Sequence, residues 1–154
     1  MKIFRSALLG LVFVGASISI NAHATDASIT KSVSPGSMLV LPNGGTRMSQ
    51  FGLISSDFPR GTLPKRKTLT SIEWQTTWYP EGEGETLELC YFRPYSRTEV
   101  GCRAIQPNSS GTINDFNNQR FDNGAKVTIF HRVNGGRDVI QPVGQDIVTF
   151  RYTY

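Results

Sequence analysis

The chain has 154 residues, with 16 lysines and arginines against 12 aspartates and glutamates, which gives a formal net charge of +4. Two of the basic residues, Lys2 and Arg5, belong to the N-terminal segment described next, and without them 14 basic residues face 12 acidic ones. A charge so close to balance argues against a nucleic-acid partner, which needs a strongly basic surface. About 130 residues follow that segment, enough for one domain with a hydrophobic core.

The N-terminus has the three parts of a secretory signal peptide. Two basic residues precede a short apolar run, Ala7 to Ile20, and Ala22-His23-Ala24 has the small residues of a cleavage site. We expect residues 1–24 to be removed and residues 25–154 to form a single exported domain in the periplasm. A membrane anchor is the alternative, but this run is short for a span and no other stretch is long or apolar enough to be one.

Short strands separated by turns are expected in the first half of the exported part. Residues 25–31 resemble a mobile or edge segment, and strands are predicted at residues 38–41 and 47–54. Residues 55–67 contain two prolines and a glycine and are predicted to form a long loop. The basic end of this loop, Lys65-Arg66-Lys67, is expected to be solvated.

Residues 68–79 give the clearest strand pattern, because their side chains alternate between two faces. Trp74 and Trp78 share the face predicted for the core, and Tyr79 falls on the opposite face. The turn that follows, residues 80–85, alternates glycine with glutamate and is expected to be solvated.

The only two cysteines lie in neighbouring alternating runs that predict a β-hairpin. Folding this hairpin places Cys90 opposite Cys102 and Phe92 opposite Val100, so that the two thiols face each other across the strands. A disulfide there adds about 3 kcal/mol to stability by the chain-entropy estimate. Such a bond persists only in an oxidising compartment, which agrees with export.

The rest of the chain continues the same pattern. A polar loop is predicted at residues 107–123, a strand at 126–133, a tight hairpin turn at 134–136, a returning segment at 138–141, and a final strand at 147–154. No stretch after the signal peptide has helical periodicity. Eight or nine short strands with frequent turns predict an all-β, single-domain antiparallel β-sandwich with one disulfide.

Few residues suit catalysis. His131 is the only histidine outside the signal peptide, and we expect it to pack or hydrogen-bond rather than act as a base. The sequence has no Gly-x-Ser-x-Gly or His-Glu-x-x-His motif and no cluster of metal ligands. Glu81, Glu83 and Glu85 could hold Ca²⁺ weakly, but a solvated acidic turn is favoured. We therefore expect no enzyme activity, no cofactor and no metal.

The aromatic residues permit a binding function. Tyr79, Tyr91 and Tyr95 are expected at the surface, where tyrosines stack on sugar rings or anchor protein interfaces. Arg97 and Arg137 could accompany them, although isolated arginines are usually solvated. These five side chains are the candidate binding residues.

Several segments between residues 71 and 154 together resemble a known family. They are Ser71-Ile72-Glu73-Trp74, Leu87-Glu88-Leu89-Cys90, Gly101-Cys102-Arg103, Gly111-Thr112, Val133-Asn134-Gly135-Gly136-Arg137 and Ile147-Val148-Thr149-Phe150-Arg151-Tyr152. In order and spacing they resemble the flagellar protein FlhE family, small exported proteins encoded with flagellar export genes. This resemblance implies a periplasmic β-sandwich that acts by protein contact.

The resemblance also implies a role as a non-enzymatic accessory protein of flagellar assembly or export. Such a protein would contact export or rod components, either to limit proton leakage at the export gate or to chaperone exported subunits. The turn Gly135-Gly136-Arg137 is its most site-like element. Two alternatives stay open: a secreted carbohydrate-binding or adhesion module that uses the exposed tyrosines, and a small periplasmic hydrolase inhibitor.

Overall fold

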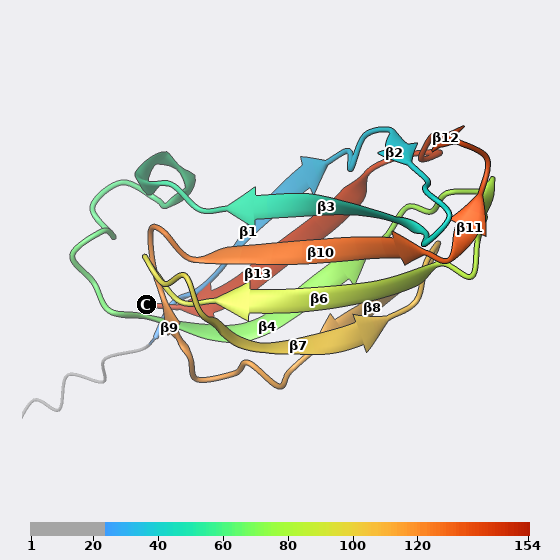
Figure 1. The fold of residues 1–154 in the computed structure, drawn as a ribbon. Helices are drawn as coiled ribbons and strands as arrows, with labels where there is room; N and C mark the ends of the chain where they lie inside the picture. Colours follow the sequence, from blue (N-terminus) through green and yellow to red (C-terminus); the bar gives the residue numbers. More distant parts are fainter. Residues whose placement is uncertain (1–23) are drawn as a thin grey trace, which may run out of the picture.

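The computed structural model describes residues 24–154, which form two packed antiparallel sheets with short paired segments at one end (Figure 1). The predicted signal peptide, residues 1–24, lies outside the described residues except for its last position. The all-β prediction is confirmed, since the helical structure in residues 24–154 is one 3-10 turn, Ser55–Asp57. In this part of the chain no helix has the length and apolar character needed to span a membrane.

The first sheet brings together segments from both ends of the described chain. Its strands are β1 (Asp26–Val33), β4 (Lys67–Gln75), β8 (Ser110–Ile113), β9 (Arg120–Phe121) and β13 (Asp146–Thr153). Their order is β1-β13-β4-β8, and β9 also pairs with β4. The predicted edge segment at residues 25–31 is thus part of the edge strand β1. The predicted polar loop at residues 107–123 is wrong in part, because it contains β8 and β9.

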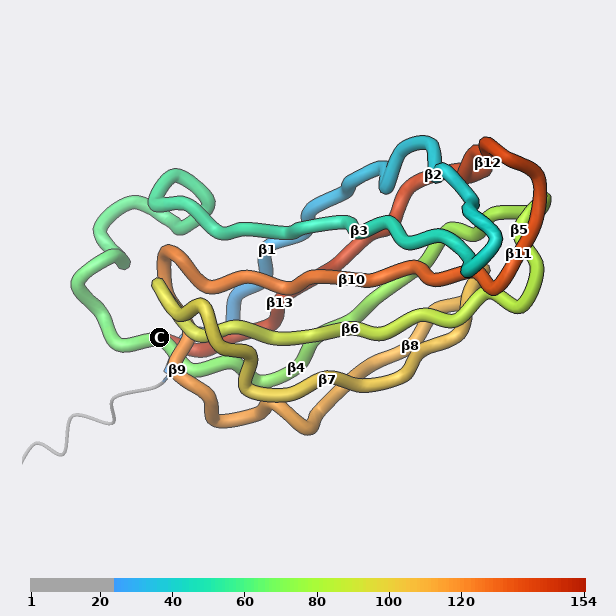
Figure 2. Tube along the Cα trace, in the orientation of Figure 1, coloured from blue at the N-terminus to red at the C-terminus, as the bar shows by residue number. Residues whose placement is uncertain are grey.

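The second sheet has the order β3-β10-β6-β7 and contains the cysteine hairpin. Its strands are β3 (Gly45–Gly52), β6 (Thr86–Phe92), β7 (Glu99–Ile105) and β10 (Lys126–Val133). In residues 24–154, the two sheets together contain eight strands of four or more residues, as a sandwich of eight or nine strands predicts. In Figure 2 this second sheet lies in front of the first, whose strands β1, β13 and β4 pass obliquely behind it.

Four two-residue strands pair at one end of the sandwich, which we call the tip. They are β2 (Met38–Leu39), β5 (Gly82–Glu83), β11 (Gly135–Gly136) and β12 (Val139–Ile140). The predicted hairpin at residues 134–136 is wrong, since β11 pairs with β5 and β12 pairs with β2 (Figure 1). Asn134 N donates to Glu83 O, and this hydrogen bond holds the chain against β5. Gly136, at φ 140°, lies so close to Glu81 O that a larger residue would not fit there.

The main core lies between the two sheets and follows the alternation of the long strands. On β6 the inward residues are Leu87, Leu89 and Tyr91, and on β13 they include Phe150 and Tyr152, all of them buried. Each such apolar side chain contributes roughly 1.5–3 kcal/mol through burial. Because apolar and polar residues alternate, the sequence of each strand determines which of its two faces packs against the other sheet.

The alternation predicted across residues 68–79 stops at Gln75, where β4 ends. Beyond it, Thr77 N donates to Asp146 Oδ1 at 2.9 Å instead of joining the ladder. The chain then turns so that Tyr79 is fully buried and Trp78 is 36% exposed. The prediction that Trp78 is core and Tyr79 is on the surface is therefore wrong, while Trp74 packs against the main core as predicted.

Lys67 is buried, whereas Lys65 and Arg66 beside it are exposed. Its Nζ donates to Leu63 O at 3.2 Å, to Lys65 O at 3.0 Å and to Asp122 Oδ1 at 3.2 Å. All three ammonium protons are thereby used, which offsets the cost of burying the charge. The expectation that this basic triplet is solvated is wrong for Lys67, which instead fastens the β3–β4 loop to the sandwich.

Candidate functional site

Two of the three candidate tyrosines are not on the surface. Tyr79 and Tyr91 are both fully buried, and burial raises the pKa of each phenol above its ordinary value. The Tyr79 hydroxyl donates to Gly36 O at 2.6 Å, and that of Tyr91 donates to Arg120 O at 2.9 Å. The expectation of exposure is wrong for Tyr91 because it shares the inward face of β6 with Leu89.

The other candidate binding residues are exposed but lie at opposite ends of the molecule. Tyr95 is 78% exposed and, like Arg97, lies in the turn between β6 and β7. Arg137 lies at the tip, where its Nη1 donates to Glu81 Oε1 at 2.6 Å. The structure therefore does not join the five predicted residues into one site.

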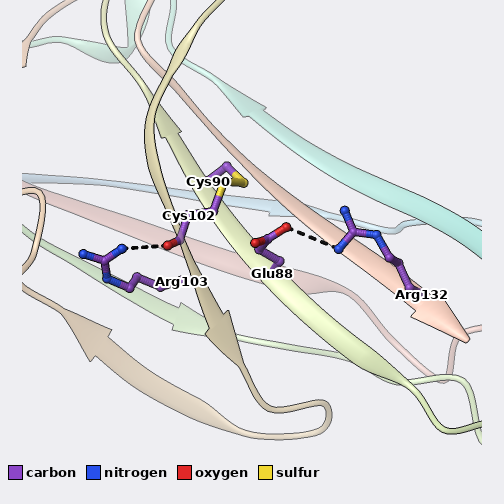
Figure 3. The surroundings of a disulfide bond; sticks show 5 residues. All are labelled: Glu88, Cys90, Cys102, Arg103 and Arg132. Carbon is purple, nitrogen blue, oxygen red and sulfur yellow. Dashed lines mark hydrogen bonds and ion pairs between the residues drawn. A yellow bond between two sulfur atoms is a disulfide. The ribbon is translucent and has the colours of Figure 1, made fainter.

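The disulfide between Cys90 and Cys102 is present, as predicted, and the two residues are directly opposite each other in β6 and β7 (Figure 3). Since Leu89 and Tyr91 face the core, the alternation of β6 places Cys90 on the outer face of the sheet. A bulge after Tyr91 shifts the register, so Phe92 lies opposite Glu99 and not opposite Val100 as predicted. The bond therefore clamps an edge strand from outside the core.

Glu88 lies beside this disulfide, and one of its oxygens is within 4.8 Å of both sulfur atoms. Among residues 24–154, Glu88, Cys90 and Cys102 are the three side chains whose potential metal-ligating atoms lie close together. The sulfurs are bonded to each other, however, and metals are bound by thiolates. The Glu88 carboxylate meanwhile accepts from Arg132 Nη1 at 3.2 Å (Figure 3). This arrangement suits an exposed sheet face better than a metal centre.

A buried polar cluster connects the two sheets just beneath the tip. Its centre is His131, whose side chain is fully buried on β10. The ring Nδ1 lies 2.9 Å from Glu85 Oε1, and Nε2 lies 2.8 Å from Asp146 Oδ2. A neutral imidazole has only one N–H, so two carboxylate partners favour the protonated ring, which donates from both nitrogens. Burial lowers the pKa of His131, but the hydrogen bonds to Asp146 and Glu85 outweigh it and raise this pKa to about 9.

Neutral donors complete the hydrogen bonding of the two carboxylates, and Ser49 shares Asp146 Oδ2 with His131. Asp146 also accepts from Ser49 Oγ at 2.6 Å and from Thr77 N at 2.9 Å, and Glu85 accepts from Tyr79 N at 3.0 Å. Both ring nitrogens and all four carboxylate oxygens are thereby hydrogen-bonded, and His131 and Asp146 are fully buried, so the cluster suits a structural role. The expectation that His131 hydrogen-bonds is confirmed, while the expectation that Glu85 is solvated is wrong, since its side chain is 6% exposed.

The tip carries apolar side chains on both of its faces. Its inner face is a small second core formed by Met38, Val40, Tyr79, Val133 and Ile140. On the outer face, Leu39 is directly opposite Val139, and these residues are 59% and 53% exposed. Leu41 follows on the same face and is also exposed. We call Leu39, Leu41 and Val139 the outer patch.

The outer patch departs from the usual pattern of surface strands. A ribbon with one buried face normally has polar residues on its other face. Contiguous exposed apolar residues with a polar rim are typical of surfaces that bind other proteins. This patch was not predicted, although the uninterrupted apolar run Met38-Leu39-Val40-Leu41, without the polar residues of an exposed strand face, indicates it.

The fold is similar to that of one solved protein over most of the chain. The crystal structure of FlhE matches with a TM-score of 0.53 at 15% sequence identity, covering 82% of this chain and 96% of that chain. Chains in structures of turnip yellow mosaic virus and infectious bursal disease virus match with TM-scores of 0.40 and 0.41, both at 11% identity. The match to the turnip yellow mosaic virus chain covers 85% of this chain and 93% of the viral chain. The match to the infectious bursal disease virus chain covers 99% of this chain and 40% of the viral chain.

No protein-family model matches the sequence, and no curated protein matches it either. The resemblance to FlhE inferred from sequence segments is thus confirmed in the fold, which this chain shares over most of its length and nearly all of the FlhE chain. The structural match shows a common fold, and an identity of 15% does not transfer a role. The chain therefore shares its β-sandwich fold with FlhE.

Proposed function

We propose that this chain is a non-enzymatic accessory protein of flagellar assembly or export, which acts in the periplasm by binding a protein partner through the tip. The observation that supports protein binding is the outer patch, because three apolar side chains stand exposed on a ribbon whose other face is already packed. The fold shared with FlhE supports the flagellar assignment.

The construction of the tip suits a rigid docking surface. The β2–β12 ribbon is short, but Met38 and Ile140 anchor it from beneath and are both fully buried. Within this second core, the ring of Tyr79 packs edge-on against the ring of His131, with 5.6 Å between the ring centres. A surface that is ordered before binding loses little conformational entropy when a partner docks.

The partner we propose is an export-gate or rod component, or an exported subunit that passes through the periplasm. In the first case binding would limit proton leakage, and in the second it would shield an aggregation-prone subunit. Both roles need an apolar contact surface and neither needs a catalytic group. The disulfide supports an oxidising compartment for the protein.

A genetic test compares the outer patch with an equally exposed apolar residue elsewhere. In a strain lacking the gene, we expect defects in motility or filament number that the wild-type chain restores and the double variant Leu39→Ser with Val139→Ser does not. Ile54→Ser is the control, since Ile54 is 57% exposed and lies in the β3–β4 loop, away from the tip. Swimming and filament number that stay normal without the gene would contradict the flagellar proposal.

A further inference from the structure

The end of the sandwich opposite the tip, which we call the basic end, collects positively charged side chains that are far apart in the sequence. The β3–β4 loop, the β6–β7 turn, β9 and the start of β10 all meet there (Figures 1 and 2). Among residues 24–154, the lysines and arginines at this end that form no ion pair are Arg60, Lys65, Arg66, Arg93, Arg97, Arg120 and Lys126.

The negative charges at this end are few and partly neutralised. Asp57 pairs with Lys31 at 2.7 Å, and Asp122 pairs with the buried Lys67 at 3.2 Å. Among the acidic side chains of residues 24–154, this leaves Asp26 and the exposed Glu99 without an ion pair at the basic end. The excess of positive charge is therefore local, although the exported chain as a whole is close to neutral.

Two adjoining hollows lie within the basic end. The larger, of about 390 Å³, is lined by Pro64, Lys65, Arg66, Lys67, Arg120 and Asp122, together with Phe121. The smaller, of about 210 Å³, is lined by Leu63, Pro94, Tyr95, Arg120, Asp122 and Asn123. Arg120 borders both hollows and its side chain is exposed. Arg120 therefore offers positive charge to both hollows, and Asp122, which also lines both, is paired with Lys67.

Tyr95 forms a fixed aromatic wall of the smaller hollow although it is 78% exposed. Its backbone is held in the left-handed region at φ 58° by a hydrogen bond from Tyr95 N to Gly124 O. The Tyr95 hydroxyl accepts from Asn123 Nδ2 at 2.7 Å, and the ring lies against Gly124. A non-glycine residue in this conformation is strained, and strained residues cluster at binding sites.

We propose that the basic end binds an acidic glycan, with a sugar ring stacked on Tyr95 and its carboxylate or phosphate group paired with Arg120. A sugar presents an apolar C–H face that suits an exposed aromatic ring, and a guanidinium binds a carboxylate or phosphate through two parallel hydrogen bonds. Lys65 and Arg66 then receive the acidic group of the next sugar along the larger hollow. This site is separate from the tip, so either proposal can fail without the other.

The concave shape favours a glycan over the other polyanions. A bilayer surface is flat and is contacted by protruding basic side chains, whereas Arg120 and Tyr95 line hollows. An acidic polypeptide would use the positive charges but would not need an exposed aromatic wall between them. Binding to a glycan should therefore depend on both the charge of Arg120 and the ring of Tyr95.

The test is calorimetric titration of the protein, purified after expression of the full chain, with polygalacturonate and with its fully methyl-esterified form. We expect the acidic polymer to bind, more weakly as salt increases, and the uncharged ester not to bind. Arg120→Gln should weaken binding about tenfold through loss of a charged hydrogen-bonding group. Tyr95→Ala should weaken it about fivefold through loss of the stacking surface. Arg137→Gln, at the tip, is the control and should bind as the wild type does.

Several results would overturn the glycan proposal. One is the absence of binding to polygalacturonate, and another is equal binding of the acid and the ester. Polyglutamate that binds as tightly as polygalacturonate, with no effect of Tyr95→Ala, would show that the basic end recognises charge alone. Binding to phosphatidylglycerol vesicles without binding to polygalacturonate would assign this end to membranes instead.

Discussion

At the scale of single residues, His131 is the clearest case in which the contacts of a side chain could not be predicted from the sequence. Its strand pattern places it on the face shared with Val127 and Ile129, and predicts a packing or hydrogen-bonding role. Its partners, Glu85 and Asp146, lie in segments that come next to β10 only after both sheets have formed. No local pattern links these three positions, so the buried cluster could not be predicted.

The charge on His131 makes stability depend on pH. Its pKa in the folded protein, about 9, lies above its ordinary value of 6.5, so folding favours the protonated ring. The stabilisation is fully present below pH 6.5 and is lost as the pH rises through 9. We expect the free energy of unfolding to fall by about 3 kcal/mol over this range. Urea denaturation at a series of pH values measures it.

His131→Gln provides the control for this pH dependence. It should reduce stability at pH 6 by about 3 kcal/mol, because the two carboxylates lose the positive charge between them. It should also flatten the decline between pH 6.5 and 9. If the variant keeps the same decline as the wild type, other groups cause it and the charged-histidine interpretation is wrong.

At the scale of elements, the strands with regular alternation could be predicted well. The cysteine hairpin, β10 and β13 were all found, because one face of each is buried and the other is not. The predictions failed where pairing partners lie far apart in the chain. Strands β8 and β9 are short and lie in a mostly polar stretch, and they form because β4 offers them an edge to pair with.

The disulfide should stabilise the hairpin without being needed for the fold. Cys90 and Cys102 clamp β7 from the outer face, so their loss leaves the core side chains in place. Replacing both by alanine should lower the free energy of unfolding by about 3 kcal/mol while the far-UV circular dichroism stays native. The measurement is urea denaturation of the wild type and the double variant.

Reductant supplies the matched control for this prediction. It should destabilise the wild type to the level of the double variant and leave the variant unchanged. Labelling of the native wild type should find no free thiol. Identical denaturation midpoints for the wild type and the variant would contradict the proposed clamp.

At the scale of the whole molecule, the two ends of the sandwich differ in chemistry. The tip exposes apolar side chains over a second core, and the basic end exposes cations around two hollows. The fold class could be predicted from strand spacing, and the likeness to FlhE from segments between residues 71 and 154. The two surfaces could not, because each is assembled from loops and short strands that are distant in sequence, such as Leu39 with Val139.

The measurement that tests the central claim most directly is site-specific photo-crosslinking in the periplasm of living cells. A photoreactive residue at position 39 or 139 lies in the outer patch, and one at position 54 is the exposed control outside it. We predict adducts with a flagellar export-gate protein, a rod protein or an exported subunit at positions 39 and 139 but not at 54. Equal labelling at all three positions, or adducts only with cell-wall fragments or a secreted hydrolase, would contradict the account.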